Sequence, residues 1–389
     1  MTRNILFTSL PTPGHVNPTL PLVEELVRRG HRVTYGVHPK MSRAVVSAGA
    51  DLLPIDFEMP PQPASRTSGP ERFAHRLALF AELIEAGFPS LLDHARAERP
   101  DAVCYDMMTP SGRMIAERLG LLGVGLLPSF ASNRHTMESL LPSMASPDQS
   151  TLQPVWRTLR RMAREHRVSM STVMMAGPPA QLNIVFLPRR FQLAGETFDD
   201  SYHFVGPDLG TRSRAGGWSP PDPSSLVLFV SLGTASHRPD LFRLCAEAFR
   251  DGAWHTVMAV GDHVDTGTLG PLPPTVEVRP FFPQPAVLRH ADVFLSHTGM
   301  NSTMEALLSG VPIVALPQRP EQEVIASRVE ALGLGRRLRE TDLTPGILRA
   351  AVEEVHRDEG IRREVHAMRQ CMRGVGGAVA AADVIEAQW

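Results

Sequence analysis

The stretch from Phe281 to Gln322 reads Phe281-Phe282-Pro283-Gln284, then His297-Thr298-Gly299-Met300-Asn301-Ser302-Thr303-Met304-Glu305, then Glu321-Gln322. The apolar run Val293–Ser296 comes directly before the central block and predicts a buried strand, and a second such run follows at Ile313–Leu316. The block between them opens with a glycine-containing loop and continues as a helix. This order of strand, helix and strand predicts an α/β fold with a parallel sheet, in which ligands bind at the carboxyl ends of the strands.

The loop after Val293–Ser296 has the composition of an anion site. Free N–H groups at a helix start, together with the positive end of the helix dipole, favour a phosphate. Gly299 lets the backbone approach a ligand closely. His297, Asn301 and Ser302 add side-chain donors at this helix start, and Met300 is the fourth residue that we expect beside the ligand there. A diphosphate is therefore the ligand that we expect here.

The flanking residues extend this site on both sides. Glu305 follows Asn301 by one helical turn, so its carboxylate is placed to accept two ribose hydroxyls. Phe281 or Phe282, followed by Gln284, offers a flat surface for a base, and Glu321 with Gln322 offers acceptors and a donor to a hexose. Taken singly, these residues have ordinary structural interpretations as core or surface positions. Their joint, ordered occurrence predicts a site for a nucleotide-activated sugar.

The whole chain of 389 residues is long enough for two domains and reads as two α/β halves. Strands are expected in the first half at Ile5–Thr8, Val33–Val37, Ala102–Tyr105, Val124–Leu127, Val185–Leu187 and His203–Val205. Strands of the second half are expected at Leu226–Val230, Val257–Val260, Val276–Val278, Val293–Ser296 and Ile313–Leu316. The predicted domains are 1–205 and 226–389, joined by a Gly/Pro/Ser/Asp-rich linker over 206–225; the C-terminal helix either stays with the second domain or packs back on the first.

Two loops at predicted strand ends complete the candidate site. Ser231, Gly233 and Thr234 follow the first strand of the second half and add donors to the diphosphate. In the first half, His15 lies in the loop Pro11–Val16 after the first strand, and Asp106 ends a later strand. A histidine held by a carboxylate is a competent general base near neutral pH. Each residue alone also fits a structural role, His15 as a turn residue that caps a helix and Asp106 as an N-cap or buried aspartate.

Composition excludes several other classes of function. The net charge of −2 gives no indication of nucleic acid binding. The three cysteines are far apart and form no C-x-x-C pair, and neither H-E-x-x-H nor Asp-x-Asp occurs, so no metal site is predicted. The absence of G-x-G-x-x-G argues against a dinucleotide cofactor. No apolar run reaches the roughly 18 residues of a membrane span, and no signal-peptide pattern opens the chain, so a cytoplasmic protein is expected.

On these residues the chain resembles the GT-B glycosyltransferases of family 1, in particular bacterial enzymes that glycosylate macrolides and other natural products. The resemblance covers essentially the whole chain. It is carried by Pro13–Pro18, the strand that ends at Asp106, the loop Ser231–Thr234 and the block His297–Gln322. It implies two Rossmann-like domains facing a central cleft.

The resemblance also implies a reaction, which is inverting transfer from a UDP- or TDP-sugar without a metal or another cofactor. It implies His15 as the base with Asp106 as its partner. It further assigns His297, Asn301 and Ser302 to the diphosphate, Glu305 to the ribose, and Glu321 with Gln322 to the sugar.

Two departures from the family pattern affect these assignments. The family usually has tryptophan at the position of Phe281, and it usually has Asp-Gln where this chain has Glu321-Gln322. The retained acid–amide pair still favours a fully hydroxylated hexose such as glucose.

The expected acceptor is a hydrophobic hydroxylated molecule, a macrolide, another polyketide or a phenolic compound. The methionine-rich region 131–182, which we expect to be mostly helical, either binds that acceptor or forms the core of a helical subdomain. The methionines concerned are Met137, Met144, Met162, Met170, Met174 and Met175.

Two alternative functions share the predicted donor site. One is a nucleotide-sugar-binding auxiliary protein without turnover, and the other is a further GT-B enzyme such as a sugar-nucleotide epimerase. The sequence gives no indication of the oligomeric state.

Overall fold

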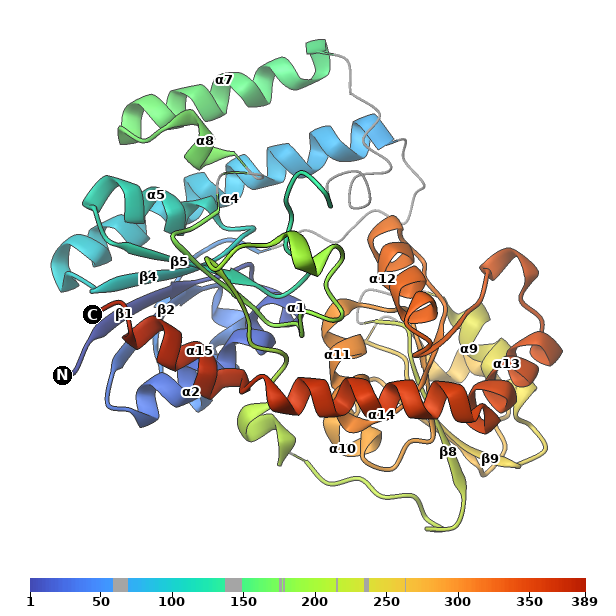
Figure 1. Cartoon of the computed structure of the whole chain (residues 1–389). Helices are drawn as coiled ribbons and strands as arrows, with labels where there is room; N and C mark the ends of the chain where they lie inside the picture. The colour runs from blue at the N-terminus through green and yellow to red at the C-terminus, as the bar shows by residue number, and fades with distance from the viewer. Residues whose placement is uncertain are drawn as a thin grey trace. The chain divides into compact units, whose positions relative to one another are not determined.

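The computed structural model describes residues 1–58, 69–136, 149–174, 177, 179–214, 216–233, 238–262 and 264–389. These residues form two compact units, which are described one at a time. The first unit falls within Met1–Pro60, Ser65–Gly210 and Val375–Trp389, and the second contains Thr211–Gly374. Figure 1 shows the elements of each unit along the chain.

The first unit is built on a parallel sheet of seven strands in the order β3-β2-β1-β4-β5-β6-β7. The strands are β1 (Asn4–Thr8), β2 (Arg32–Val37), β3 (Asp51–Pro54), β4 (Ala102–Asp106), β5 (Leu122–Leu127), β6 (Leu182–Val185) and β7 (Tyr202–Phe204). The chain builds the sheet in one direction from β1 to β3 and in the other from β4 to β7. The order therefore reverses between the neighbours β1 and β4, which is where ligands bind in sheets of this type.

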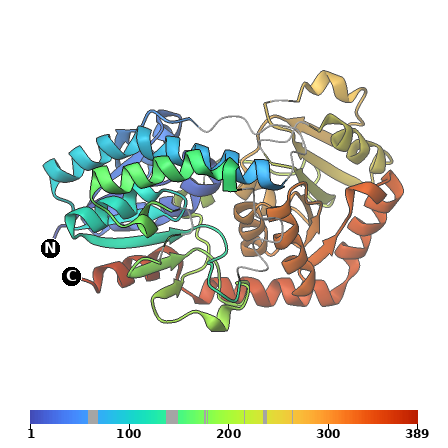
Figure 2. The ribbon, with the colours of Figure 1, turned by 90° about the horizontal axis from the view of Figure 1, so that it is seen from above.

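Helices cover both faces of this sheet (Figure 1). They are α1 (Pro13–Val16), α2 (Leu20–Arg28), α3 (Ser42–Ser47), α4 (Gly69–Glu98), α5 (Pro110–Leu119), α7 (Gln149–His166), α8 (Met170–Val173) and α15 (Gly377–Glu386). Successive side chains of β1 alternate between two cores, because strand residues point to opposite faces. Ile5 and Phe7 pack with α2 and α15, whereas Leu6 packs with α4, α5 and α7. Figure 2 shows α4 and α7 running alongside each other.

The second unit repeats this plan with six parallel strands in the order β10-β9-β8-β11-β12-β13. The strands are β8 (Leu226–Ser231), β9 (Trp254–Ala259), β10 (Val276–Arg279), β11 (Val293–Ser296), β12 (Ile313–Ala315) and β13 (Gly335–Arg337). The order again reverses between the first and the fourth strands, here β8 and β11. Their register pairs Ser231 with Ser296 at the carboxyl edge.

The helices of the second unit are α9 (Pro239–Ala248), α10 (Gln284–Leu288), α11 (Met300–Ser309), α12 (Pro320–Ala331), α13 (Pro345–Arg357) and α14 (Glu359–Gly374). Leu228 and Val230 of β8 join the apolar core that α9 and α13 close. Phe229 stacks on Phe294 of β11 with 5.0 Å between the ring centres. Apolar residues on both faces are expected for a parallel sheet covered by helices on each side.

The fold class predicted from the sequence is confirmed, with differences at the sheet edges. The outer strands β3 and β13 were not expected, because Asp51–Pro54 and Gly335–Arg337 are short and carry polar residues, as edge strands often do. The strand expected at Val185–Leu187 lies earlier, at Leu182–Val185, and Pro188 follows soon after its end. The region 131–182 contains α7 and α8, and residues 137–148 lie outside the described residues.

The division between the units falls at Gly210 and Thr211, within the range that composition marks as a linker. A short 3₁₀ helix, η4 (Gly210–Ser213), spans this point. The C-terminal helix α15 belongs to the first unit and packs on α2, whereas α14 belongs to the second.

Arg29 attaches α15 to α2 through several carboxylates. Its guanidinium donates to Glu25 at 2.7 Å, to Asp383 at 2.7 Å and to Glu386 at 2.5 Å. The Arg29 side chain is only 15 % exposed, so these charges lie in a partly dehydrated environment. The hydrogen bond from Arg28 is the main reason why the pKa of Glu25 is lowered to about 2. The hydrogen bond from Arg29 also lowers this pKa, whereas burial raises it. The network therefore stabilises the attachment of the C-terminal helix.

We expect Arg29→Met to lower the free energy of unfolding by about 2 kcal/mol, because it removes the one partly buried cation that joins Glu25 of α2 to Asp383 and Glu386 of α15. Hydrogen exchange of α15 should rise at the same time. Arg28→Met is the matched control, since Arg28 also binds Glu25 but is 69 % exposed. Its effect should be much smaller. Equal effects in thermal and urea unfolding of the two variants would contradict the assignment.

Candidate functional site

His15 and Asp106 meet at the carboxyl edge of the first sheet. His15 lies in α1 directly after β1, and Asp106 is the last residue of β4, the neighbour of β1. The segment Pro11–Val16, expected as a loop, contains a helical turn. Pro13, whose fixed φ suits a first helical position, starts α1 after Thr12, and a 3₁₀ turn follows at Asn17–Thr19.

The contact between these two side chains is short and its carboxylate is fully buried. His15 Nδ1 lies 2.6 Å from Asp106 Oδ2, and the side chain of Asp106 is 0 % exposed. The other carboxylate oxygen, Oδ1, accepts a hydrogen bond from the backbone N–H of Met108 at 2.7 Å. An acceptor at Nδ1 selects the tautomer with its proton on Nδ1 and its lone pair on Nε2. This tautomer is the one that a general base needs.

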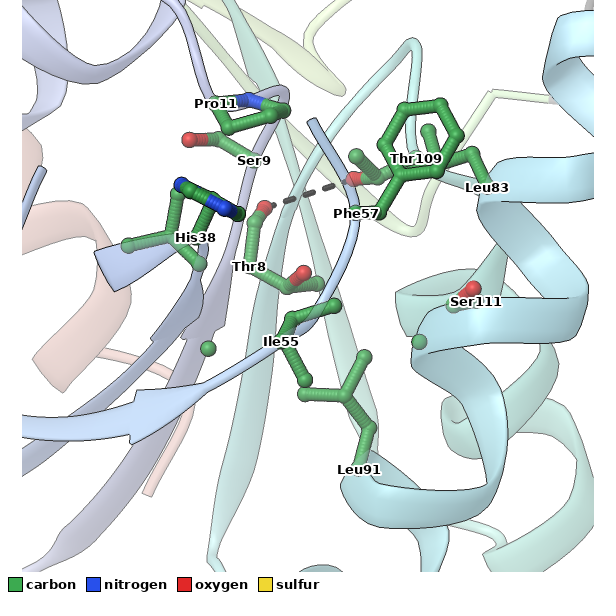
Figure 3. A pocket seen from close by; sticks show the side chains of 13 residues that line it. Thr8, Ser9, Pro11, His38, Ile55, Phe57, Leu83, Leu91, Thr109 and Ser111 are labelled. Atoms are coloured by element: carbon green, nitrogen blue, oxygen red, sulfur yellow. Dashed lines mark hydrogen bonds between the residues drawn. The ribbon is translucent and has the colours of Figure 1, made fainter. Parts of the chain in front are cut away.

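A small pocket lies at the same edge of the first sheet (Figure 3). Its interior leaves only about 10 Å³, which is room for about one water molecule. Thr8, the last residue of β1, and Ser9, the residue after it, line this pocket. The Thr109 hydroxyl donates to the Thr8 carbonyl oxygen at 3.3 Å. Its apolar lining consists mainly of Ile55, Phe57, Leu83 and Leu91. The lining of this small pocket therefore combines hydroxyl groups with apolar side chains.

Two methionines of the methionine-rich region pack in the core of the first unit, and three others lie outside the described residues. Met162 is buried in the core formed with α4 and α5, and Met170 packs against the same core. Met137, Met144 and Met175 lie outside the described residues. For the two methionines in this core, the interpretation as a helical subdomain core is therefore the one that fits.

His297 and Ser231 meet at the corresponding edge of the second sheet. His297 follows β11, and its Nδ1 lies 3.4 Å from the carbonyl oxygen of Ser231, the last residue of β8. Two glycines allow the ring to lie there. A Cβ at Gly299 would stand 2.6 Å from His297 Nε2, and one at Gly233 would stand 2.9 Å from it. Thr234 lies outside the described residues.

The imidazole of His297 is neutral at physiological pH in this structure. Burial lowers the pKa of His297 to about 4; the hydrogen bond to Ser231 opposes this shift and the charge of Arg319 adds to it. With the proton on Nδ1, the Nε2 atom of the neutral ring is an acceptor. His297 therefore becomes a second donor to an anion only in its charged form, which a bound phosphate would favour.

Thr298 takes a backbone conformation that sequence reasoning did not anticipate. Its φ is +59°, a left-handed value that is strained for a β-branched residue. The buried side chain compensates, because its hydroxyl lies 2.6 Å from the His297 carbonyl oxygen and 3.0 Å from the Gln322 carbonyl oxygen. The Thr298 N–H also donates to Ser296 Oγ at 3.0 Å. This turn connects the start of α11 to the start of α12. The only sequence signal for it is the polar residue pair between a strand and a glycine.

Helix α11 begins at Met300 with Gly299 as its N-cap, and no side chain caps it. The N–H groups of the first turn, those of Met300, Asn301 and Ser302, are the ones that the geometry of a helix start leaves without an intrahelical acceptor. Asn301 also has a structural role, since its Nδ2 donates to Glu305 Oε1 at 3.1 Å. The structure thus brings the predicted phosphate donors together at one helix end.

The carboxylate of Glu305 is the most densely bonded group of this site. Gln284 Nε2 donates to Glu305 Oε2 at 2.7 Å, and Arg212 Nη2 lies 2.9 Å from Glu305 Oε1. With Asn301, two hydrogen-bond donors and one ion pair reach a side chain that is 2 % exposed. Arg212 comes from the segment between the two sheets, and no local pattern in the sequence identifies it as a partner of Glu305.

The remaining predicted residues lie at the borders of this site. Phe281 is 54 % exposed, and Phe282 carries the Arg279 guanidinium over its ring at 4.8 Å. Glu321 is exposed in the first turn of α12. Gln322 is buried, and its Oε1 accepts a hydrogen bond from the Gln318 N–H at 2.9 Å, so its amide nitrogen remains as a donor.

Among the residues that the structure describes, no group of three or more His, Cys, Asp or Glu side chains is arranged to hold a metal ion. Within the same ranges, no helix combines the length and the apolar character that crossing a bilayer requires.

Comparison with known proteins identifies relatives along the whole chain. Residues 254–375 match the family described as the C-terminal domain of erythromycin biosynthesis protein CIII-like proteins. The chain is 36% identical to the NDP-glycosyltransferase YjiC of Bacillus licheniformis, over 99% of this chain and 97% of that protein. It is 37% identical to the demethyllactenocin mycarosyltransferase of Streptomyces fradiae, over 98% of this chain and 86% of that protein.

A solved structure gives the same result. The calicheamicin glycosyltransferase CalG4 superimposes with a TM-score of 0.87 at 36% identity, covering 99% of this chain and 98% of that one. At this identity and coverage, the likeness extends to both sheets and to the loops that carry the candidate site.

We expect Thr298→Val to lower the free energy of unfolding by about 1–3 kcal/mol, because it leaves the buried Gln322 carbonyl without its hydroxyl partner. Thr298→Ser is the matched control, since it keeps the hydroxyl. Urea unfolding followed by tryptophan fluorescence measures both variants. An equal loss in the two would show that the hydrogen bond is not what stabilises this turn.

The pKa of His297 predicts a loss of stability in acid. An unfolded histidine titrates near 6.5 and the folded one near 4, so the unfolded state binds more protons between these values. The contribution of His297 is complete above pH 6.5 and decreases as the pH falls to 4, by about 1–3 kcal/mol. We expect His297→Gln to lose less stability than the unchanged protein between pH 7.5 and 4.5. The matched control is His366→Gln, at an exposed histidine, which should leave the pH dependence of the free energy of unfolding unchanged. If His297→Gln also leaves it unchanged, His297 is not the group that destabilises the fold in acid.

Proposed function

We propose that this chain, which belongs to the family 1 glycosyltransferases of GT-B fold, transfers a hexose to a hydroxyl of a hydrophobic natural product. The donor is a nucleoside diphosphate sugar. The acceptor class follows the relatives, whose names include a mycarosyltransferase and a calicheamicin glycosyltransferase. The observation that carries the proposal is the 2.6 Å contact between His15 Nδ1 and the buried Asp106 carboxylate.

In the proposed reaction, His15 is the general base. Its Nε2 takes the proton from the acceptor hydroxyl while that oxygen attacks the anomeric carbon of the donor. The bond between the anomeric carbon and the diphosphate oxygen breaks, so one displacement inverts the configuration. The buried Asp106 stabilises the imidazolium that forms and keeps the ring in the correct tautomer.

The leaving diphosphate is negatively charged, and the start of α11 is suited to it. The N–H groups of the first turn and the helix dipole stabilise this charge. His297 adds to this effect, because the approach of the diphosphate raises the pKa of its imidazole and makes the charged, doubly donating form available. No metal ion enters this proposal, since fixed donors and charges of the chain take the role that a cation would have.

The sugar is proposed to be a fully hydroxylated hexose such as glucose, bound by Glu321 and Gln322. The exposed carboxylate of Glu321 accepts from sugar hydroxyls, and the amide nitrogen of Gln322 donates to one. For the acceptor, the pocket at the end of β1 provides hydroxyl groups beside apolar side chains (Figure 3).

Mass spectrometry tests the activity directly. Reactions pair UDP-glucose, and separately TDP-glucose, with a pooled panel of hydroxylated polyketides and phenols. A hexose-sized gain in the mass of an acceptor supports the proposal. Nucleotide binding without any transfer would instead indicate an auxiliary protein, and a change in the donor sugar alone would indicate an epimerase.

We expect His15→Ala to lower kcat by about 10²-fold or more, the usual effect of losing a general base, with nucleotide affinity nearly unchanged. The matched control is His366→Ala, which removes an exposed histidine on α14 and should retain full activity. Steady-state kinetics and calorimetric titration of the nucleotide measure the two effects. Full activity of His15→Ala would rule out the mechanism.

A further inference from the structure

Two buried hydroxyl side chains stand at the ends of the segment that carries His15. Ser9 directly follows β1, and Thr19 ends the 3₁₀ turn at Asn17–Thr19, so α1 and its connections lie between them. Ser9 is 3 % exposed and Thr19 is 0 % exposed. Hydroxyls that are removed from water in this way need hydrogen-bond partners, because a buried polar group without one is costly.

Tyr35 of β2 is a partner of both hydroxyls. Its own hydroxyl lies 2.8 Å from Ser9 Oγ and 2.8 Å from Thr19 Oγ1, and the tyrosine is 0 % exposed. The sheet fixes the phenol, since Tyr35 pairs with Phe7 of β1 and the two ring centres are 5.6 Å apart. One side chain of the sheet therefore attaches both ends of the segment from Ser9 to Thr19.

The protons of these three hydroxyls run in one direction. Thr19 Oγ1 donates its only proton to the Val16 carbonyl oxygen at 2.8 Å. The phenol of Tyr35 is therefore the donor to Thr19, and Ser9 in turn donates to Tyr35. Burial is the main reason why the pKa of Tyr35 is raised above its usual value, so the phenol keeps its proton and remains a donor.

The segment between these hydroxyls has little stability of its own. Helix α1 has four residues, and so short a helix is unstable alone. No side chain of the described residues caps its start, and the N–H groups of His15 and Val16 share one acceptor, the Thr12 carbonyl oxygen, at 3.0 Å each. The orientation of the His15 ring toward Asp106 thus depends on how the two ends of the segment are attached.

We infer that Tyr35 is a positioning residue, whose hydroxyl joins Ser9 to Thr19 and thereby holds His15 against Asp106. The inference rests on the proposed function, in which His15 is the general base. Tyr35 acts through the backbone of the segment and takes no part in the proton transfer itself. A small displacement of a catalytic group is enough to lower a rate substantially, so the loss of this hydroxyl should be visible in kcat.

Steady-state kinetics of Tyr35→Phe test the inference. We expect kcat to fall by about tenfold, because the base is no longer held in place. Calorimetric titration with UDP and TDP should show unchanged affinities. The matched control is Tyr202→Phe, which removes the hydroxyl of a tyrosine on β7 of the same sheet and should retain full activity. An unchanged kcat of Tyr35→Phe would overturn the inference.

Thr19 separates the effect of the hydrogen bond from that of packing. Thr19→Val keeps the shape of the side chain without its hydroxyl and should reproduce the loss of Tyr35→Phe. Thr19→Ser keeps the hydroxyl and should stay close to the activity of the unchanged protein. Equal losses of kcat in the two Thr19 variants would show that packing, and not the chain of hydroxyls, is responsible.

A double-variant cycle with His15→Ala distinguishes positioning of the base from general damage to the fold. If Tyr35 acts through His15, adding Tyr35→Phe to His15→Ala should cause no further loss of the residual rate. The same fold loss in both backgrounds would overturn the inference. Full activity of His15→Ala would instead reject the proposed base, whatever Tyr35 does.

NMR of ¹⁵N-labelled histidine needs neither donor nor acceptor, so it tests the inference even if no acceptor reacts. The His15 signals, identified by their loss in His15→Ala, should show a neutral ring with its proton on Nδ1. In Tyr35→Phe we expect them to shift toward a mixture of tautomers, and identical signals in the two proteins would overturn the inference. If the unchanged protein lacks the form with the proton on Nδ1, the proposed base fails, and the inference with it.

Discussion

The reversal of strand order in each parallel sheet is the constraint on which the rest of the structure depends. In the first sheet β1 and β4 are neighbours, and in the second β8 and β11 are, although the chain builds outwards in opposite directions from each pair. The connections that leave such a pair go to opposite sides, so the carboxyl edge between the two strands stays uncovered. His15 with Asp106, and Ser231 with His297, lie at these two edges.

Both edges contain a carboxylate that is removed from water and held by donors of its own unit. Asp106 receives the His15 imidazole and a backbone N–H, which fixes one tautomer of the ring. Glu305 accepts hydrogen bonds from Gln284 and Asn301 and forms an ion pair with Arg212. A buried carboxylate needs such partners, since an unpaired one is costly. The number of partners then determines how much of each carboxylate remains for chemistry or recognition.

The strained and dehydrated groups of the second unit are concentrated at the same edge. Thr298 has a left-handed backbone, and His297 is held neutral by burial. Strain of this kind persists only where the surroundings determine it, and here a hydrogen bond to Gln322 and the packed strands behind the turn supply that support. The stacked Phe229 and Phe294 lie on β8 and β11, the two strands that end at this site. A rigid sheet thus positions a turn that is unfavourable by itself.

The sequence by itself determined the features that are local in the chain. Apolar runs identified most of the strands, and the positions of His15 and Asp106 at strand ends predicted that they would lie at one sheet edge, because parallel strands share that edge. The strained Thr298, the contact of Arg212 with Glu305 and the attachment of α15 by Arg29 were decided only by the tertiary structure. Each depends on groups that are distant in the chain, and the period and spacing of residues carry no information about which distant partner satisfies a buried charge.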